Sequence, residues 1–337
     1  MKTVVVQRPN EAIVVEERPV PEPKAGEVLI KVHACGVCHS DLNVWLGLFP
    51  FAKYPMVPGH EVAGVVAKLG EGVTWPSVGD HVGMPWLYSS CGHCNLCVQG
   101  DEVLCQTAPE VTGVTKDGGY QEYMIAPAAF VAPIPKELDF AEAGPLMCAG
   151  LTVFNGLRVA RYQVGQKVAI IGLGGLGHLG VLFAKAMGAR VAVISTSSDK
   201  EAEARRLGAE YFVNTSAKKA AEALREWDGG ADIILATAPN TDTMTESLPG
   251  LAPEGTLVAL GVGAGEVRAD PSGLIGGRRK LIGSPSGSRK DIRATLKFAA
   301  HNHVVPIVTK FPLQDAGKVL QMMRDGKLRG RAVLVLE

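Results

Sequence analysis

The distribution of apolar and polar positions divides the chain into two parts. Up to about residue 150, apolar runs such as "EVLIKVHA", "VAGVVAKLG" and "GDHVGM" are short and are separated by Gly and Pro. Short Val-rich runs bounded by turn residues are typical of β-strands. This part of the sequence therefore predicts a β-rich domain with many turns.

From Val164 onward the pattern changes to alternating strands and helices. The runs "KVAIIG", "RVAVIS", "ADIILATA", "TLVALG" and "KLIGS" are apolar, whereas "LGVLFAKAMG" and "DKEAEARRLG" have helical spacing. Apolar strands that alternate with helices are typical of a parallel sheet covered by helices. We therefore expect an α/β domain here.

The tail after Ser284 begins with "RKDIRATLKFAAHNH", which predicts a helix with Leu296 and Ala300 on one face. The segment "QDAGKVLQMMRDG" and the closing strand "RAVLVLE" follow. Periodicity alone leaves open whether this tail extends the second domain or returns to the first.

Length, composition and charge narrow the class of protein. A chain of 337 residues exceeds the size at which one hydrophobic core keeps growing, so two domains are expected. The 34 basic and 34 acidic side chains cancel, so no net field attracts nucleic acid or an anionic membrane. The N-terminal segment contains charges and prolines where a signal peptide needs an apolar core, and no run of about 18 apolar residues occurs. We expect a soluble cytoplasmic protein whose partner is a small molecule.

Four cysteines in "CGHCNLCVQGDEVLC" have metal-ligand spacing: Cys91, Cys94, Cys97 and Cys105. In a chain without an export signal, such spacing favours thiolate ligands over disulfides. Four thiolates close a tetrahedron around zinc and leave no open position, so this zinc holds a loop instead of doing chemistry. A zinc module can also bind nucleic acid, but this segment carries Asp101 and Glu102 and no Lys or Arg.

The segment "VAIIGLGGLGHLGVLFAKAMGA" places Gly172, Gly174 and Gly177 in a G-x-G-x-x-G pattern. The pattern follows an apolar strand and opens a helix, the context in which backbone amides and a helix N-terminus hold a pyrophosphate. The alternative is close helix–strand packing through small residues. We favour a dinucleotide site.

The end of the next strand, "VAVISTSSDK", indicates which dinucleotide binds. An NAD site normally ends this strand with Asp or Glu, but Ser195 stands there, and Asp199 falls in the start of the next helix. Hydroxyls remove the repulsion toward a 2′-phosphate, and Ser195, Thr196 and Lys200 are candidates to bind that phosphate. We therefore favour NADP, with NAD as the alternative; Lys200 can also be read as a solvated helix residue.

A second group of possible metal ligands is spread over three segments. Cys38 lies in "GVCHSDL", His60 in "PGHEVAG" and Cys148 in "GPLMCAGLT". Two thiolates and one imidazole leave the fourth position of a zinc ion for water or substrate, which is the arrangement of a catalytic zinc.

The joint occurrence of "GVCHSDL", "GHEVAGVV", "CGHCNLCVQGDEVLC", "CAGLT", "GLGGLG" and "GKLRGRAV", in that order, resembles the zinc-dependent alcohol dehydrogenases of the medium-chain dehydrogenase/reductase superfamily. The resemblance covers essentially the whole chain. "MPWLYSSCGHC" and the C-terminal segment are similar to the tetrameric bacterial and yeast-type enzymes. "YPMVPGHE" and "VISTSSDK" are closer to the NADP-dependent cinnamyl-alcohol branch.

The resemblance implies an α/β protein with two domains. A β-rich GroES-like catalytic domain takes residues 1–149 and 285–337, so the tail returns to it. A Rossmann domain with a doubly wound parallel sheet takes residues 150–284. The resemblance also implies two zinc ions per chain and a homotetramer or homodimer.

It further implies roles for single residues. Cys38, His60 and Cys148 match the catalytic zinc ligands, and Glu61 matches an acid behind the metal that can take the fourth position. Asp41 matches the carboxylate that orients the liganding His, and Ser40 matches the hydroxyl that takes the substrate proton. His39, Arg331 and the glycine loop, with Gly172, Gly174, Gly175 and Gly177, match pyrophosphate contacts. Thr152 and Leu176 match residues that line the nicotinamide. Phe49 and Trp86 fall where this family narrows its substrate pocket.

One position departs from the family pattern. The family's proton relay ends in a His three residues after the hydroxyl, and here Asn43 occupies that position. An amide does not accept protons near neutral pH. The relay is therefore expected to end in water or another group.

The sequence thus predicts reversible hydride transfer between NADP and a primary alcohol, aliphatic or aromatic, or its aldehyde. The alternatives are an NAD-dependent enzyme and a polyol or secondary-alcohol dehydrogenase, which the bulk of Phe49 and Trp86 opposes. From another class, the chain would be an inactive nucleotide-binding protein, which the intact ligand set and Ser40 oppose.

Overall fold

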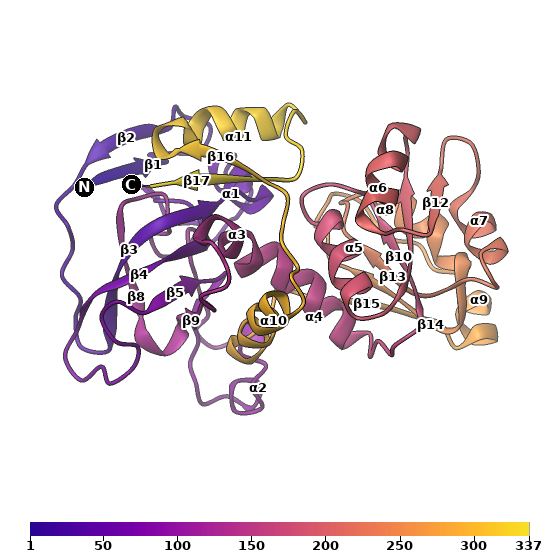
Figure 1. Ribbon diagram of the computed structural model, residues 1–337, viewed down its shortest axis with the longest axis horizontal. Helices are drawn as coiled ribbons and strands as arrows, with labels where there is room; N and C mark the ends of the chain where they lie inside the picture. Colours follow the sequence, from indigo (N-terminus) through magenta and orange to yellow (C-terminus); the bar gives the residue numbers. More distant parts are fainter. Residues whose placement is uncertain (337) are drawn as a thin grey trace. The chain divides into compact units, whose positions relative to one another are not determined.

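A computed structural model describes residues 1–336, which form two compact units. The first unit comprises Met1–Leu151, Ser286–His301 and the chain from Pro306 onward. The second comprises Thr152–Pro285 and Asn302–Val305. Each unit has its own sheet and its own helices (Figure 1).

The first unit is built around a seven-stranded sheet in the order β16-β17-β3-β4-β5-β9, in which β8 also pairs with β3. Its strands are β3 (Glu27–Gly36), β4 (Glu61–Leu69), β5 (His81–Met84), β8 (Tyr123–Pro127), β9 (Ala132–Pro133), β16 (Val308–Pro312) and β17 (Arg331–Val335). The pairs are antiparallel except for β16 with β17. The runs expected to be strands in the N-terminal part form β3, β4 and β5.

Smaller elements complete this unit. Two short antiparallel pairs join β1 (Lys2–Val5) to β2 (Val14–Glu17) and β6 (Leu87–Ser89) to β7 (Glu110–Val111). Its helices are α1 (His39–Trp45), α2 (Asn95–Val98), α3 (Phe140–Pro145), α10 (Arg289–His301) and α11 (Ala316–Arg324). Val28, Ile30 and Val32 of β3 are fully buried and alternate along the strand, as a half-covered sheet requires.

The pairing of β3 with β4 brings two of the sequence motifs together. Gly36, at the end of β3, is the register partner of Glu61, at the start of β4. A side chain at Gly36 would collide with the Glu61 carboxylate, so glycine is required there. The residues that follow Gly36 and precede Glu61 therefore lie at one end of the sheet.

The second unit contains a six-stranded parallel sheet in the order β12-β11-β10-β13-β14-β15. Its strands are β10 (Lys167–Ile171), β11 (Arg190–Ser195), β12 (Tyr211–Asn214), β13 (Ala231–Ala236), β14 (Leu251–Ala259) and β15 (Lys280–Gly283). The strand order reverses between β10 and β13, which is the point where a doubly wound sheet binds its ligand. The predicted α/β fold class, with a β-rich domain and a parallel-sheet domain, is confirmed.

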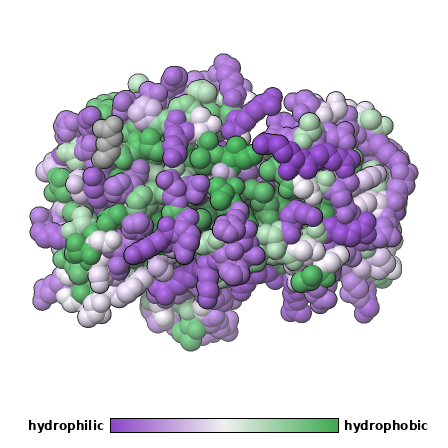
Figure 2. Space-filling view, in the orientation of Figure 1, coloured by the Kyte–Doolittle hydropathy of each residue, from purple (hydrophilic) through white to green (hydrophobic). Residues whose placement is uncertain are grey.

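The helices of the second unit alternate with the strands of the parallel sheet along the chain. They are α4 (Leu151–Val159), α5 (Gly177–Ala186), α6 (Glu201–Leu207), α7 (Ala220–Glu226), α8 (Thr241–Ser247) and α9 (Pro271–Gly277). Val168, Ala169 and Ile170 of β10 are fully buried in succession, because both faces of a parallel sheet are covered. The face of this unit visible in Figure 2 is largely hydrophilic. Within residues 1–336, no helix is long and apolar enough to cross a membrane.

Candidate catalytic metal centre and cofactor site

Four possible metal ligands from distant segments converge in the first unit. Cys38, His60, Glu61 and Cys148 each offer one ligand atom, and these atoms all lie within 4.8 Å of one another. Cys38 precedes α1, His60 and Glu61 stand at the start of β4, and Cys148 lies in the π-helical turn Leu146–Gly150. The structure thus brings together the three residues predicted from the sequence and the acid beside them.

The orientation of these side chains fits a metal ion. Across residues 1–336, His60 Nε2 and Glu61 Oε2 are among the few buried side-chain atoms that lack a hydrogen-bond partner. Buried polar atoms in proteins are normally satisfied, so atoms that are not call for a ligand. Two sulfurs and an imidazole nitrogen are ligands that zinc prefers, and a carboxylate is an acceptable fourth.

The buried carboxylate of Asp41 fixes two of the ligands. It lies 3.1 Å from His60 Nδ1, which leaves Nε2 for a metal. It also accepts hydrogen bonds from the backbone N–H groups of Cys38 at 2.8 Å and Gly59 at 3.1 Å. The Tyr120 hydroxyl donates a further hydrogen bond at 3.1 Å. Asp41 therefore holds the imidazole and the turn at Cys38 in one arrangement, as outer-shell groups do in metal sites.

The second carboxylate oxygen of Glu61, Oε1, belongs to an ion pair. Arg331, at the start of β17, donates a hydrogen bond from Nη2 to Glu61 Oε1 in a buried ion pair. Burial raises the pKa of Glu61 to about 7, although the neighbouring guanidinium opposes this shift. Arg331, which the resemblance assigned to a pyrophosphate, is here 6% exposed and lies against Glu61.

The two thiols of this group have pKa values that are shifted in opposite directions. A hydrogen bond from the Cys148 thiol holds the pKa of Cys38 well below its usual range, with burial opposing and His60 assisting. The same hydrogen bond raises the pKa of Cys148. A thiolate is the form of cysteine that binds metal.

Three further predicted residues lie close to the ligands. Ser40 Oγ is 3.9 Å from Cys38 Sγ. The ring of Trp86 meets the His60 ring edge-on, with 5.0 Å between centroids. Phe49 lies against Trp86 at 6.0 Å. His39 differs from these three in that its side chain is exposed at the start of α1.

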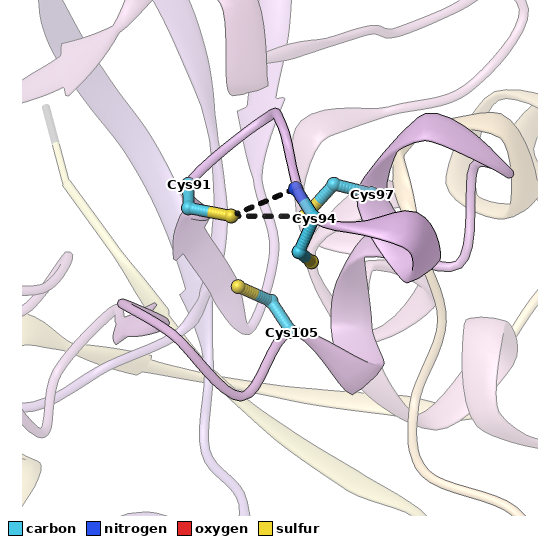
Figure 3. A group of neighbouring side chains, drawn as sticks. All are labelled: Cys91, Cys94, Cys97 and Cys105. Atoms are coloured by element: carbon cyan, nitrogen blue, oxygen red, sulfur yellow. Dashed lines mark hydrogen bonds between the residues drawn. The ribbon is translucent and has the colours of Figure 1, made fainter.

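The four cysteines of residues 91–105 form a second group, with all ligand atoms within 4.8 Å of one another. Figure 3 shows the four sulfurs around one centre. Cys91 Sγ and Cys97 Sγ are 3.8 Å apart, and the backbone N–H of Cys94 donates to Cys91 Sγ at 3.4 Å. The backbone N–H groups of His93 and Cys94 lower the pKa of Cys91 to about 6. His93 itself is exposed, and the group fits a closed zinc site without it.

The glycine-rich turn lies in the second unit, between β10 and α5. Gly172 has φ of 87°, in the left-handed region that favours glycine. A side chain at Gly177 would collide with the Gly172 carbonyl, whereas one at Gly174 would meet nothing within 4 Å. The backbone at Gly174 is therefore open to a ligand just before a ten-residue helix, which fits a pyrophosphate on the turn that Gly175 and Leu176 complete.

The remaining predicted cofactor residues also lie in this unit. Ser195 is the last residue of β11, and its Oγ accepts a hydrogen bond from the Ser197 N–H at 3.3 Å. Thr196 follows it and is exposed, and Lys200 is partly buried just before α6. Thr152 is buried in the first turn of α4.

Sequence comparison places the chain among known proteins. Residues 24–136 match the family described as "Alcohol dehydrogenase GroES-like domain" and residues 175–301 match "Zinc-binding dehydrogenase". An alcohol dehydrogenase of Geobacillus stearothermophilus is 40% identical over 338 aligned residues, which cover 100% of both chains. The chain belongs to the zinc-binding alcohol dehydrogenases of the medium-chain dehydrogenase/reductase superfamily. The resemblance found from the motifs is therefore confirmed.

Solved structures of this alcohol dehydrogenase family agree with the fold. The CAD of Helicobacter pylori, complexed with NADP(H), has a TM-score of 0.87 and 27% identity, covering 99% of this chain and 97% of that one. The acetophenone reductase of Geotrichum candidum, in complex with NAD, has a TM-score of 0.85 and 29% identity, with the same coverage. Both nicotinamide cofactors thus occur among the structural relatives.

Tyr120 is a residue of the site that sequence reasoning missed. It is fully buried and bonded to Asp41, from which it is separated by 79 positions. The segment "GGYQEY" carries no spacing or composition that marks a tyrosine of a metal site. Backbone hydrogen bonds to Pro58 and Val4, both far away in the sequence, hold it there.

Proposed function

We propose that this alcohol dehydrogenase oxidises primary alcohols, aliphatic or aromatic, and reduces the corresponding aldehydes with NADP. The observation that carries the substrate class is the position of Trp86, whose ring edge contacts His60. Phe49 packs behind it. Two bulky aromatic rings beside His60, a proposed zinc ligand, leave little room for a second carbon substituent on the reacting carbon of the substrate.

We propose that Cys38, His60 and Cys148 hold the catalytic zinc, with Glu61 able to take a fourth position, and that the four cysteines of residues 91–105 hold a structural zinc. When bound, the catalytic zinc supplies Lewis acidity toward the substrate oxygen, and the nicotinamide accepts or supplies the hydride. Asp41 keeps His60 Nε2 turned to the metal. Ser40, 3.9 Å from a ligand sulfur, is placed to take the alcohol proton.

The proton then leaves by a route that ends differently from the family pattern. Asn43 lies on α1, one turn after Ser40, where the family places a histidine. Its amide does not accept protons near neutral pH. We therefore propose that the proton taken by Ser40 passes to water or to another group.

The proposal of NADP rests on residues at the carboxyl end of β11. Ser195 ends this strand in place of a carboxylate, and Thr196 and Lys200 follow within the same connection. Hydroxyls and an ammonium suit a phosphate better than they suit a bare ribose. The NADP(H) complex of the Helicobacter pylori relative supports this assignment, whereas the NAD complex of the Geotrichum candidum relative keeps NAD as the alternative.

We also propose that Thr152 and the turn from Gly172 to Gly177 hold the cofactor in the second unit. The division into a catalytic domain (residues 1–149 and 285–337) and a cofactor domain (residues 150–284), a cytoplasmic location and a homotetramer or homodimer belong to the same proposal. Sedimentation of the purified protein would measure its oligomeric state.

The decisive experiment measures initial rates with benzaldehyde and with acetaldehyde, each at equal NADPH and NADH, before and after a strong chelator. We expect chelator-sensitive turnover that is faster with NADPH. Faster turnover with NADH would contradict the assignment of Ser195. Absence of turnover with either aldehyde would contradict the substrate class.

A second candidate is a secondary-alcohol dehydrogenase, because the Geotrichum candidum relative is named an acetophenone reductase. The same assay with acetophenone separates the two candidates. We expect acetophenone to be a poor substrate of the wild-type protein and a better one after Trp86→Ala. Efficient reduction of acetophenone by the wild type would favour the second candidate.

A further inference from the structure

The segment of residues 91–105, called the zinc lobe below, is fastened to the first turn of α10. Glu102 of the lobe is buried, with 4% of its surface exposed. Its carboxylate accepts a hydrogen bond from Arg289 Nε at 2.8 Å, one from the Arg289 backbone N–H at 3.1 Å, and one from Arg289 Nη2. Figure 1 shows α10 beside the short helix α2 of the lobe.

Neighbouring residues strengthen this junction. The Val103 N–H donates to Ser288 Oγ at 3.1 Å. The Arg289 guanidinium lies over the Phe130 ring at 4.6 Å and donates from Nη1 to the Ala129 carbonyl at 3.2 Å. The lobe therefore contacts the residues with which α10 begins through a buried carboxylate that accepts three hydrogen bonds from Arg289.

The other side of α10 lies against the turn that carries Cys148. This helix contacts the π-helical turn Leu146–Gly150. At Gly287, just before the helix, an added Cβ would lie 2.7 Å from Leu151 Cδ1, so the chain there packs directly on the residue after the turn. Ile292 and Leu296 of α10 are buried. A shift of the first turn of α10 therefore displaces the segment that holds Cys148, because close-packed elements transmit strain.

We propose that Glu102 and Arg289 are positioning residues that couple the four-cysteine site to the three-ligand site. In this coupling, an occupied zinc lobe holds Glu102 in place, Glu102 holds the start of α10, and α10 holds Cys148 at the distance that a catalytic metal requires. The inference rests on the proposed assignment of a metal to each group. It concerns metal retention, which is measured without any substrate.

The chain offers a matched control in the same junction. Lys290 follows Arg289 in the sequence, and Asp101 precedes Glu102. These two neighbouring side chains form an ion pair at 2.9 Å. Both of these side chains are 47% exposed, and exposed ion pairs contribute little. In the proposed pair the side chain of Glu102 is 6% exposed and that of Arg289 is 39% exposed, so removing the arginine leaves a buried carboxylate without its cation.

The experiment uses the purified zinc-loaded protein, its Glu102→Gln and Arg289→Met variants, the conservative Arg289→Lys variant and the control Lys290→Met. A chromogenic chelator follows zinc release, and zinc remaining per chain is measured at intervals. Cobalt exchanged into the three-ligand site gives a visible spectrum that reports the geometry of the thiolate ligands there. These readouts distinguish loss of metal at one site from general unfolding, which far-ultraviolet circular dichroism monitors.

We expect zinc at the three-ligand site to leave about tenfold faster in Glu102→Gln and Arg289→Met than in the wild type, the scale on which outer-shell groups act. The cobalt spectrum should shift in both variants, Arg289→Lys should fall between them and the wild type, and Lys290→Met should match the wild type. Unchanged release and an unchanged spectrum in both variants would overturn the inference. So would an equal acceleration in Lys290→Met.

A second variant tests the coupling from the other end. Cys91→Ser removes one ligand of the zinc lobe and lies outside the three-ligand site. We expect it to accelerate zinc release from the three-ligand site as well. Loss of the lobe zinc with wild-type release from the other site would overturn the coupling. Failure of the wild type to turn over any alcohol would contradict the proposed function and leave these metal measurements valid.

Discussion

Asp41 Oδ1 lies 3.1 Å from His60 Nδ1, and both side chains are almost fully buried. The same carboxylate accepts the backbone N–H of Cys38. One acidic side chain therefore sets the direction of an imidazole and the position of a thiolate, two ligands from different segments of the chain.

Asp41→Asn should weaken metal binding at the three-ligand site. The amide has nearly the same shape but lacks the charge. Only one of its two ends accepts hydrogen bonds, so its NH2 group must face either the His60 Nδ1–H or the N–H of Cys38. We expect a loss of about 10–100-fold in zinc affinity, measured by competition with a chelator. Tyr120→Phe, which removes only one hydrogen bond to Asp41, serves as the milder comparison. Equal affinities in Asp41→Asn and the wild type would refute the role of Asp41.

Cys38→Ser should abolish turnover in a folded protein. A hydroxyl is a poor substitute for a thiolate ligand, so the loss should exceed the roughly 100-fold effect of outer-shell changes. Metal analysis should show that the zinc at the four-cysteine site remains while the other is lost. Full activity in a variant that has lost this zinc would mean that the metal is not part of the reaction.

Ser195→Asp should reverse the cofactor preference. A carboxylate at the end of β11 repels a 2′-phosphate and accepts hydrogen bonds from ribose hydroxyls. Hydrogen bonds to charged groups contribute about 1.5–3 kcal/mol, so kcat/KM with NADPH should fall about 10–100-fold. Lys200→Met should lower kcat/KM with NADPH without improving NADH. A variant with the same preference as the wild type would rule out this part of the cofactor site.

Asn43→His should change the pH dependence of alcohol oxidation. The wild type lacks a titrating group at this position, so its kcat/KM should vary more weakly with pH than that of the variant. An imidazole with a pKa of about 6.5 accepts the released proton only in its neutral form, so the rate of the variant should rise with pH through that value. Superimposable pH profiles of the two proteins would show that the relay does not pass residue 43.

Much of the fold was predictable from short-range pattern. The apolar runs in "KVAIIG" and "RVAVIS" became adjacent parallel strands because their two covered faces leave no polar position. The strand β12 (Tyr211–Asn214) was not predicted. It stands at the edge of its sheet and has only one fully buried residue, so neither a continuous apolar run nor a clear alternation marks it.

The candidate metal groups were predictable for a different reason. Cysteine and histidine are few in this chain, and their spacing limits the chemistry that they can share. Positioning residues have no such signature in the sequence. Glu102 and Arg289 are separated by 187 positions, and ordinary charged residues at such a distance become partners only through the packing of α10.

The ion pair of Glu61 and Arg331 has a consequence for biosynthesis. Its two members are 270 positions apart in the chain. At 5–20 residues per second, a ribosome adds the arginine some tens of seconds after the glutamate. During that interval Glu61 lacks the guanidinium with which it pairs in the folded protein. This buried ion pair therefore forms late, only when β17 has left the exit tunnel and joined β3.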